Sequence, residues 1–425
     1  MYMKIINITS LEILDSRGLP TIKTYIHLED GSIHSSAVPS GASTGRYEAT
    51  EKRDSDTGKI EIGKRYLGCG VLTAIENVSK YIKPNLIGMD CENIKEIDSK
   101  MIEIDGTEYK NNLGANAILS VSQAMVRAGA HSQKKHLWKF INEYYNLEKK
   151  PSFPGIFVNV INGGKHADWN FPFQEFLLKI NEKSISDSIR IAAEIFGSMK
   201  IYLKSRKYST LVGDEGGYSP PVFSNIEACE VIKETMKYLP YDFGTQVMIS
   251  IDSAASEFFN DGKYTFKKNG KDDEIFNSEQ LLKYYKDLST NFPIYSIEDP
   301  FDQEDWATYK KITNEIGNKI TIIGDDLFVT NTKRIKRGID EKSANGVLIK
   351  LNQIGTVSET IDAITMAQKV GWTIAVSHRS GETEDSFIAD LAYAVGADFI
   401  KTGSMSRSER LAKYNRLMEI ERFEA

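Results

Sequence analysis

The second half of the chain contains short apolar stretches that each end on a charged residue. Five of these charged residues are Asp252, Glu298, Asp325, Lys350 and Lys401, and successive members are 46, 27, 25 and 51 residues apart. A sixth stretch, TIAVS, divides the last interval and ends beside His378 and Arg379. About 25 residues is the length of one strand and one crossover helix, the repeating unit of a parallel α/β barrel. Because the carboxyl ends of barrel strands meet at one face, we expect these charges to converge there.

The pattern upstream completes a barrel of eight strands. Apolar stretches at 156–161 and 173–180 predict two neighbouring strands, and helical periodicity covers 184–205 and 226–238. Six strand–helix units then begin at Val247, Ile294, Ile320, Gly346, Thr373 and Phe399, before a final helical pattern at 407–421. The predicted fold class is therefore α/β. Residues 141–425 form a TIM-like (β/α)8 barrel with an irregular ββαα(βα)6 start, in which the second strand need not be parallel.

Residues 1–140 have a different pattern and predict an α+β domain. Polar and apolar residues alternate at 5–14 and 21–28, and turn residues follow at 29–31, which indicates an antiparallel sheet. Helical periodicity follows at 71–81 and 116–130. The segment SGASTG, at 40–45, has six small residues that cannot pack a core. It is either a surface linker or a loop that approaches a ligand closely, and composition alone favours the linker.

Composition and charge narrow the class of protein. The chain has 425 residues, 41% hydrophobic and 26% charged, which is typical of a soluble globular protein with a large core. A net charge of -6 without a long basic run argues against nucleic-acid binding. We expect no signal peptide and no membrane span. Three scattered cysteines, Cys69, Cys91 and Cys229, predict reduced thiols and a cytoplasmic location.

The acids at the strand ends predict a metal site only when they are taken together. A single acid after a strand, such as Asp252, is usually a helix cap or a turn residue. Three acids in register at successive strands, with Glu298 and Asp325 as the others, would repel one another without a compensating charge. A divalent cation supplies that charge, and oxygen ligands favour magnesium or manganese over zinc.

The two strand-end lysines allow a similar pair of interpretations. Lys350 in GVLIKLNQIG and Lys401 in DFIKTGS are flanked by apolar residues, and such a lysine often extends outward to solvent. Inside a barrel mouth, beside a metal and each other, both lysines are expected to have depressed pKa values. One could then abstract a proton while the other remains a cation.

Glycine-rich segments add further polar groups. INGGKHAD contains His166, GDEGG contains Glu215, and SHRSGETED contains His378, Arg379 and Ser380. Arg379 with Ser380 predicts a phosphate clamp, because a guanidinium group matches the edge of a phosphate. The sequence contains no G-x-G-x-x-G, Walker or G-x-S-x-G motif, which argues against dinucleotide, nucleotide triphosphate and serine-hydrolase chemistry.

In these and other segments the chain resembles the enolases over nearly its whole length. The matching segments, in the order of the family, are LDSRGLPT, VPSGASTG, LGANAILS, INGGKHAD, FQEF, VGDEGGYSP, SIEDPF, GDDLFVTN, LIKLNQIG, SHRSGETED and IKTGSMSRSERLAKYN. The forms of GDDLFVTNTKRI and KTGSMSRSERLAKYN are similar to bacterial enolases. The chain departs from the family pattern at Ser253 and around residues 169–173, close to Glu175 and His166.

The resemblance implies a hydro-lyase that interconverts 2-phosphoglycerate and phosphoenolpyruvate in glycolysis and gluconeogenesis, with two Mg²⁺ ions stabilising an aci-carboxylate. The implied ligands are Asp252, Glu298 and Asp325 for the first magnesium, and Ser40 for a second that arrives with substrate. The implied catalytic residues are Lys350 as base, Glu215 as acid, Glu175 in support of Glu215, and His378. The implied substrate contacts are His166, Glu175, Lys350, Arg379, Ser380 and Lys401, with Arg379 and Ser380 on the phosphate and Lys401 on the carboxylate.

The resemblance also bears on partners and leaves one alternative reaction open. Enolases assemble as homodimers or as octamers built from dimers, so we expect a homo-oligomer. Enolases also take secondary macromolecular partners and secondary surface or secreted locations, which this sequence neither supports nor excludes. The alternative is a diverged paralogue that dehydrates another phosphorylated or phosphonylated hydroxy acid.

Overall fold

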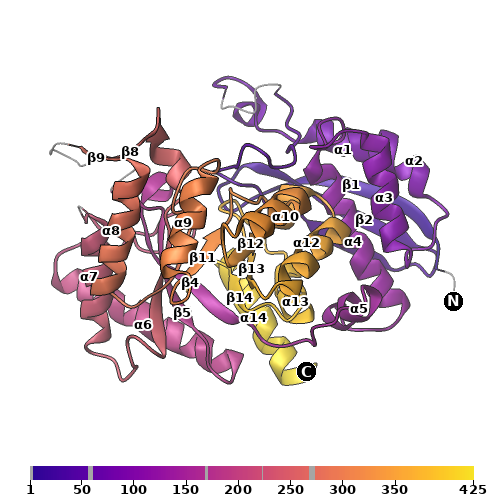
Figure 1. Cartoon of the computed structure of the whole chain (residues 1–425). Helices are drawn as coiled ribbons and strands as arrows, with labels where there is room; N and C mark the ends of the chain where they lie inside the picture. Colours follow the sequence, from indigo (N-terminus) through magenta and orange to yellow (C-terminus); the bar gives the residue numbers. More distant parts are fainter. Residues whose placement is uncertain (1–2, 56–60, 168–170, 223, 268–272) are drawn as a thin grey trace.

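A computed structural model describes residues 3–55, 61–167, 171–222, 224–267 and 273–425, without the side chains of residues 166 and 167. An antiparallel sheet with helices forms the N-terminal part of the chain, and a barrel ringed by helices forms the rest (Figure 1). Cys69, Cys91 and Cys229 are buried free thiols, as expected. In the part of the chain that is described, no helix is both long and apolar enough to cross a bilayer.

The N-terminal part is an α+β unit, as its pattern predicts. Its sheet has the order β1 (Ile5–Leu14), β2 (Pro20–Leu28), β3 (Ile33–Ala37), with both pairings antiparallel. Its helices are α1 (Leu72–Asn77), α2 (Lys83–Leu86), α3 (Ile94–Asp105), α4 (Ala115–Ser132) and α5 (Leu137–Tyr144). Helix α4 is buried along most of its length because it packs against β2 and β3 on one side and against α3 and α5 on the other.

The barrel is closed by eight strands and has the predicted irregular start. Around the barrel the order is β10 (Ile294–Glu298), β11 (Thr321–Gly324), β12 (Gly346–Ile349), β13 (Thr373–Ser377), β14 (Phe399–Lys401), β4 (Gly155–Asn162), β5 (Glu175–Ile180) and β6 (Val247–Asp252). Strand β5 pairs antiparallel with both neighbours, and the other adjacent pairs are parallel. This arrangement confirms the predicted fold class.

Most of the barrel helices begin where the sequence supplies a capping oxygen. The barrel helices are α6 (Ile185–Ser205), α7 (Asn225–Met236), α8 (Ser278–Asn291), α9 (Trp306–Ile316), α10 (Thr332–Glu341), α11 (Leu351–Ile354), α12 (Val357–Lys369), α13 (Phe387–Ala394) and α14 (Ser408–Phe423). The side chains of Ser184, Ser224, Asn277, Asp305 and Thr356 accept backbone N–H groups of the first turns of α6, α7, α8, α9 and α12. Such caps satisfy donors that have no partner within the helix. Helices α11, α13 and α14, by contrast, begin without a side-chain cap.

A layer of apolar side chains fills the barrel directly beneath the charged strand ends. The layer consists of Phe157, Leu177, Ile323, Leu348, Ala375 and Phe399, with Tyr295 packed against it. Ile323, Leu348 and Phe399 each lie two residues before a charged residue of the predicted site. Because residues i and i+2 of a strand share a face, the same alternation that packs the interior aims Asp325, Lys350 and Lys401 into the barrel mouth.

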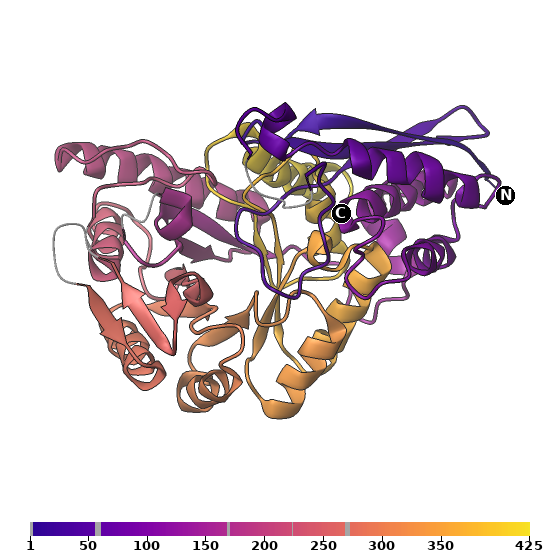
Figure 2. The same cartoon turned by 90° about the horizontal axis from the view of Figure 1, so that it is seen from above.

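Two segments differ in structure from the sequence-based expectation: the one that follows β6 and the one between β3 and α1. A small antiparallel sheet of β7 (Phe259–Asn260), β8 (Lys263–Phe266) and β9 (Glu274–Phe276) follows β6. Residues 268–272, between β8 and β9, lie outside the described residues. The segment between β3 and α1 reaches from the N-terminal sheet toward the barrel (Figure 2), and reciprocal backbone bonds of 2.8 Å join Ser40 to Gly381. The small-residue segment is therefore packed on the barrel and is not a free linker.

Candidate active site

Three carboxylates lie side by side at the strand ends because their strands pair in register there. Asp252, the last residue of β6, is opposite Glu298 on β10 and opposite Glu175 on β5. All three residues are buried, with exposures of 3%, 3% and 1%. Glu175 reaches the same edge although β5 is antiparallel, because it is the first residue of that strand. The sheet register thus brings together two predicted metal ligands and one predicted catalytic residue.

Lys401 places its ammonium group among these carboxylates. Its Nζ atom lies 2.9 Å from Asp252 Oδ2, 2.9 Å from Glu298 Oε2 and 3.3 Å from Glu175 Oε2. Burial opposes the charged form of Lys401, but these acids outweigh burial and hold its pKa well above the usual value. Burial, together with the Asp252 charge, raises the pKa of Glu298. Lys401 is therefore a fixed cation, which agrees with the predicted electrostatic role.

Lys350 forms a second, separate pair with Asp325. Lys350 Nζ lies 2.5 Å from Asp325 Oδ2, while Gln353 Nε2 donates to Asp325 Oδ1 at 2.8 Å. Burial is the largest single influence and lowers the pKa of Lys350, but the charges of Asp325 and Glu298 act against it and the net pKa is raised. Without a metal, therefore, neither lysine has a depressed pKa, because each faces carboxylates. The depressed pKa values expected beside a bound metal stay a prediction.

Glu215, Glu175 and His378 form a further group that shares Glu175 with the Lys401 cluster. Asn159 Nδ2 donates to Glu215 Oε2 at 3.1 Å, and His378 Nε2 lies 3.4 Å from the same oxygen. Burial, followed by the charge of Glu215, raises the pKa of Glu175 well above its usual range. Two adjacent carboxyls of this kind hold a proton between them, which is what an acid catalyst at neutral pH requires. Burial lowers the pKa of His378 to about 4, so this imidazole is neutral.

The predicted phosphate clamp is engaged by the small-residue segment and the residues after it. Arg379 donates to both carboxylate oxygens of Glu48, at 2.9 and 3.1 Å, and to the carbonyl of Ser43 at 2.9 Å. The hydroxyl of Ser380 accepts from the backbone N–H of Ala42 at 2.7 Å. Sequence reasoning missed Glu48, which lies outside the SGASTG segment and carries no strand-end signal. An anion that binds Arg379 has to replace this carboxylate.

Ser40 contacts the barrel through its backbone and the N-terminal part through its side chain. Its hydroxyl donates to Glu51 Oε2 at 2.9 Å and accepts from Arg53 at 2.8 Å. Binding a cation through this hydroxyl requires that these bonds be exchanged, so the role of Ser40 as a ligand stays a prediction.

The side chain of His166 and residues 169 and 170 lie outside the described residues. Ser253, a departure from the family pattern, accepts a hydrogen bond from Tyr285 at 3.0 Å.

Asp325, a predicted metal ligand, also belongs to a second cluster of acidic residues. Carboxylate oxygens of Asp299, Asp325 and Asp326 lie within 4.8 Å of one another. Asp299 accepts from Tyr309 and from the backbone N–H groups of Asp325 and Asp326, at 2.9, 3.0 and 2.7 Å. Burial and the Asp325 charge raise the pKa of Asp299 to about 7. Asp299 is therefore a backbone acceptor that shapes the loop, and Asp325 is the member that faces the lysines.

The donor set suits a hard divalent cation. Asp252, Glu298 and Asp325 offer only carboxylate oxygens, which are the ligands that Mg²⁺ prefers. The ammonium of Lys401 lies 2.9 Å from oxygens of both Asp252 and Glu298, so these two carboxylates already converge on one positive charge. The residues present therefore fit a magnesium site at the barrel mouth.

The cavity between these groups is nearly closed. Its lining includes Ser43, Glu175, Glu215, Asp252, Lys350, His378, Arg379, Ser380 and Lys401, and its volume is about 20 Å³. That volume holds about one water molecule. Ser43 belongs to the small-residue segment, so this segment forms part of the cavity wall.

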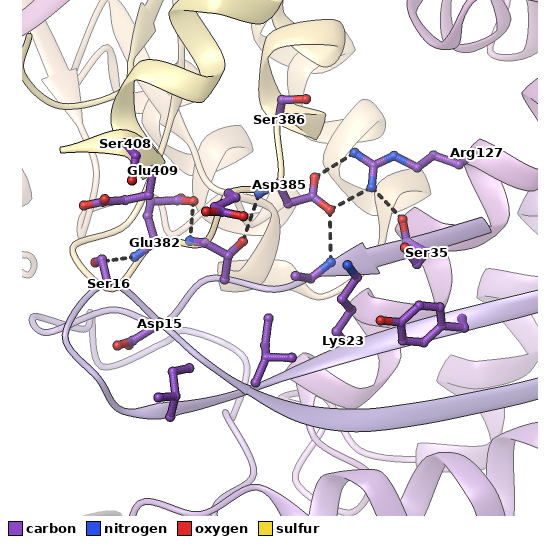
Figure 3. A pocket seen from close by; sticks show the side chains of 16 residues that line it. Asp15, Ser16, Lys23, Ser35, Arg127, Glu382, Asp385, Ser386, Ser408 and Glu409 are labelled. Carbon is purple, nitrogen blue, oxygen red and sulfur yellow. Dashed lines mark hydrogen bonds and ion pairs between the residues drawn. The ribbon is translucent and has the colours of Figure 1, made fainter. Parts of the chain in front are cut away.

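A larger cavity of about 710 Å³ lies elsewhere, between the N-terminal sheet and the segments 382–386 and 408–409. Lys23, Ser35 and Arg127 line one side of it, and Arg127 forms an ion pair with Asp385 across it (Figure 3). None of the predicted site residues lines this cavity. Volume alone therefore does not identify the reactive site.

Comparison with protein families matches two models that together span most of the chain. The model described as "Enolase, C-terminal TIM barrel domain" matches residues 150–424. The model described as "Enolase, N-terminal domain" matches residues 5–141.

Proposed function

The chain belongs to the enolase family, and on that premise we propose that it catalyses the reversible dehydration of 2-phosphoglycerate to phosphoenolpyruvate. The observation that carries the proposal is the convergence of two lysines, several carboxylates and an arginine on one cavity at the carboxyl ends of the barrel strands. This face is where barrel enzymes place their chemistry. The groups are those needed to remove a proton beside a carboxylate and to expel hydroxide from the next carbon.

Lys350 is the base in this proposal. Its Nζ atom is paired with Asp325 at 2.5 Å, and its side chain lines the cavity. A lysine acts as a base only when it loses its proton near neutral pH, and burial favours that loss once the partner charge is neutralised. When bound by Asp252, Glu298 and Asp325, magnesium neutralises these carboxylates and stabilises the negative charge that develops on the substrate. Enolase-type sites in general combine a lysine base with magnesium, and they are a known example of how a site adjusts the pKa of its catalytic groups.

Glu215 is the acid that assists departure of the C3 hydroxide. Its neighbour Glu175 has a raised pKa, so the pair can keep a proton at neutral pH. Lys350 and Glu215 line the same cavity, which allows removal of the proton and loss of hydroxide to occur on one bound molecule. The proton leaves first and hydroxide second, in a stepwise elimination that passes through a dianionic aci-carboxylate.

The remaining residues bind and enclose the substrate. Lys401 is held as a cation by Asp252, Glu298 and Glu175, which suits it to the substrate carboxylate. Arg379 and Ser380 suit the phosphate, because Arg379 already holds the carboxylate of Glu48 through two hydrogen bonds. We also propose that the segment at 40–45 is a lid, since it contacts both Arg379 and Ser380 and narrows the cavity.

The direct test is turnover of 2-phosphoglycerate by the purified protein. With Mg²⁺ present we expect the ultraviolet absorbance of an enol phosphate to appear, to stop on chelation and to return when Mg²⁺ is restored. The Lys350→Ala variant should bring turnover to background while keeping its circular dichroism and Tm. Turnover of a different phosphorylated or phosphonylated hydroxy acid, with no signal from 2-phosphoglycerate, would identify a diverged paralogue and contradict the proposal.

A further inference from the structure

Arg410 is a fully buried arginine of α14 that contacts two loops of the active site. Its guanidinium donates to His378 Nδ1 at 2.7 Å, to the Arg379 carbonyl at 2.6 Å and to the Ser380 carbonyl at 2.5 Å. It also donates to the carbonyl of Asp214, at 3.2 Å. Asp214 precedes Glu215, so one side chain joins the loop of the proposed acid to the loop of the histidine. The proposed mechanism gives Arg410 no direct role.

The direction of the bond from Arg410 to His378 determines where the histidine carries its proton. A guanidinium group has five N–H donors and no acceptor, so Nδ1 of His378 has to accept. A neutral imidazole that accepts at Nδ1 carries its proton on Nε2. The other tautomer would place two N–H groups against each other at 2.7 Å. A protonated His378 would set a second positive charge against Arg410, and its pKa is already lowered to about 4 by burial.

The proton on Nε2 faces the proposed acid. His378 Nε2 lies 3.4 Å from Glu215 Oε2, and Asn159 donates to the same oxygen at 3.1 Å. A carboxyl oxygen that faces two N–H donors is the unprotonated oxygen of that group. The transferable proton of Glu215 is therefore placed on Oε1. The 3.4 Å contact from Nε2 does not meet hydrogen-bond geometry in this structure, and catalytic contacts of this kind often tighten when substrate binds.

We propose that Arg410 is a positioning residue that holds His378 as the neutral tautomer with its proton on Nε2, so that this N–H faces Glu215 and fixes which oxygen of Glu215 carries the transferable proton. The proposal rests on the proposed function, in which Glu215 is the acid for the dehydration. The tautomer itself is a property of the protein without substrate. It can therefore be measured independently of turnover.

The experiment compares three substitutions on α14 by two readouts. Arg410→Met removes the donor, and Arg410→Lys keeps a cationic group that can only donate. Arg416→Met is the matched control, since Arg416 lies on the same helix but pairs with Asp390 and Glu424. The first readout is the ¹⁵N NMR signature of the two ring nitrogens of His378, assigned by its loss in His378→Asn. The second is kcat and KM for 2-phosphoglycerate with Mg²⁺.

In the unsubstituted protein and in Arg416→Met we expect an unprotonated Nδ1 and a protonated Nε2. Arg410→Met should show a mixture of tautomers and a kcat lower by about 10- to 100-fold, with KM changed by less than about threefold, because a misplaced tautomer impairs proton transfer more than binding. Arg410→Lys should keep the Nε2–H tautomer and retain more of kcat than Arg410→Met.

The proposal is overturned if His378 of the unsubstituted protein carries its proton on Nδ1. It is equally overturned if Arg410→Met leaves both the tautomer and kcat unchanged, or if Arg416→Met causes the same losses. Should Arg410→Met fail to fold, the spectrum of the unsubstituted protein and the Arg410→Lys variant decide the matter. If the unsubstituted protein does not turn over 2-phosphoglycerate, the proposed function fails, while the spectra still decide the tautomer.

Discussion

Lys350 follows β12 and Lys401 ends β14, with β13 between them, and the two lysines have different electrostatic surroundings. Lys401 lies among Asp252, Glu298 and Glu175, whereas Lys350 faces Asp325. Removing the charge of one carboxylate therefore frees Lys350 but leaves Lys401 with further partners. This difference supports the proposal that Lys350 is the base and Lys401 the fixed cation, whereas sequence spacing treated the two lysines as equivalent.

Asp98, a buried acid of α3 outside the site, predicts a pH dependence of stability. Its Oδ2 accepts from the backbone N–H of Ser358 at 3.0 Å, and burial raises its pKa to about 6. The native state thus keeps this proton to a higher pH than the unfolded chain, in which Asp titrates near ~3.9. Stability is therefore lost as pH rises from about 4 to about 6, by at most about 3 kcal/mol.

Asp98→Asn should remove this dependence. The free energy of unfolding of the variant should exceed that of the unsubstituted protein by about 1–3 kcal/mol at about pH 8, and the two should nearly agree at about pH 4. Urea unfolding at both pH values measures this. A difference that is the same at both pH values would show that Asp98 does not titrate in this range.

Site residues were largely predictable from sequence, whereas their hydrogen-bond partners were not. Side chains alternate in direction along each strand, and each strand–helix unit has a similar length. Together these two signals place Asp252, Glu298 and Asp325 at one face of the barrel. Neither signal encodes which lysine meets which acid. Nor could spacing reveal Glu48 or Arg410, because a side chain that reaches the site from a loop or a helix leaves no periodic pattern.

At the scale of elements, the loop after β11 is hydrogen-bonded to Lys350 and to helix α11, which follow β12. Thr330 in this loop accepts from the backbone N–H of Lys350 at 2.9 Å and donates to Gln353 Oε1 at 2.8 Å. Gln353 in turn donates to Asp325. Thr330 has a φ of 54°, a conformation that β-branched residues rarely adopt and that surrounding contacts have to maintain.

Thr330→Val should remove these hydrogen bonds without changing side-chain shape. We expect the Kd for Mg²⁺ to rise by about 10- to 100-fold, because groups that orient metal ligands have effects of that size. Isothermal titration with Mg²⁺ measures this. Thr313→Val serves as control, since the hydroxyl of Thr313 donates to the Ser343 carbonyl on the outer side of the barrel. Equal Mg²⁺ affinities for the two variants would contradict this expectation.

The elements that sequence analysis missed are those with the weakest local signal. The barrel strands and their helices were found because each unit repeats, and the capping residues mark where helices begin. Helices α3 and α5 belong to no repeat, and α5 has only eight residues. The strands β7 and β9 have two and three residues, too short for alternation to be visible.

At the scale of the whole molecule, a partly buried ion pair joins the N-terminal part to the barrel. Arg127 of α4 donates to both carboxylate oxygens of Asp385 at 2.7 Å, and the backbone N–H of Ala37 donates to Asp385 at 3.0 Å. Burial opposes the charge of Asp385, but Arg127 outweighs it and holds its pKa below the usual value. Ala37, which also contacts Asp385, lies three residues before the segment at 40–45.

Arg127→Met should therefore leave the partly buried Asp385 without its partner. We expect a loss of about 1.5–3 kcal/mol in the free energy of unfolding, together with a lower Tm, because hydrogen bonds to charged groups contribute about that much. Calorimetry measures this, with Arg190→Met as the control for a surface pair on α6. Equal losses for both variants would show that this ion pair contributes no more than a surface contact.

Two features of the whole molecule stay predictions. The boundary at residue 140 falls within α5 (Leu137–Tyr144), which packs against both α4 of the N-terminal part and α13 of the barrel, and this boundary stays a prediction. The homo-oligomer, as a dimer or an octamer, is measured by light scattering.

The central claim is that Lys350 removes the C2 proton of 2-phosphoglycerate before hydroxide leaves with the help of Glu215. Exchange of the C2 hydrogen with deuterated water, followed by NMR with Mg²⁺ present, tests it most directly. Glu215→Gln should exchange this hydrogen while forming almost no phosphoenolpyruvate, and Lys350→Ala should do neither. Exchange that persists in Lys350→Ala, or that disappears in Glu215→Gln while Mg²⁺ and substrate still bind, would contradict the account.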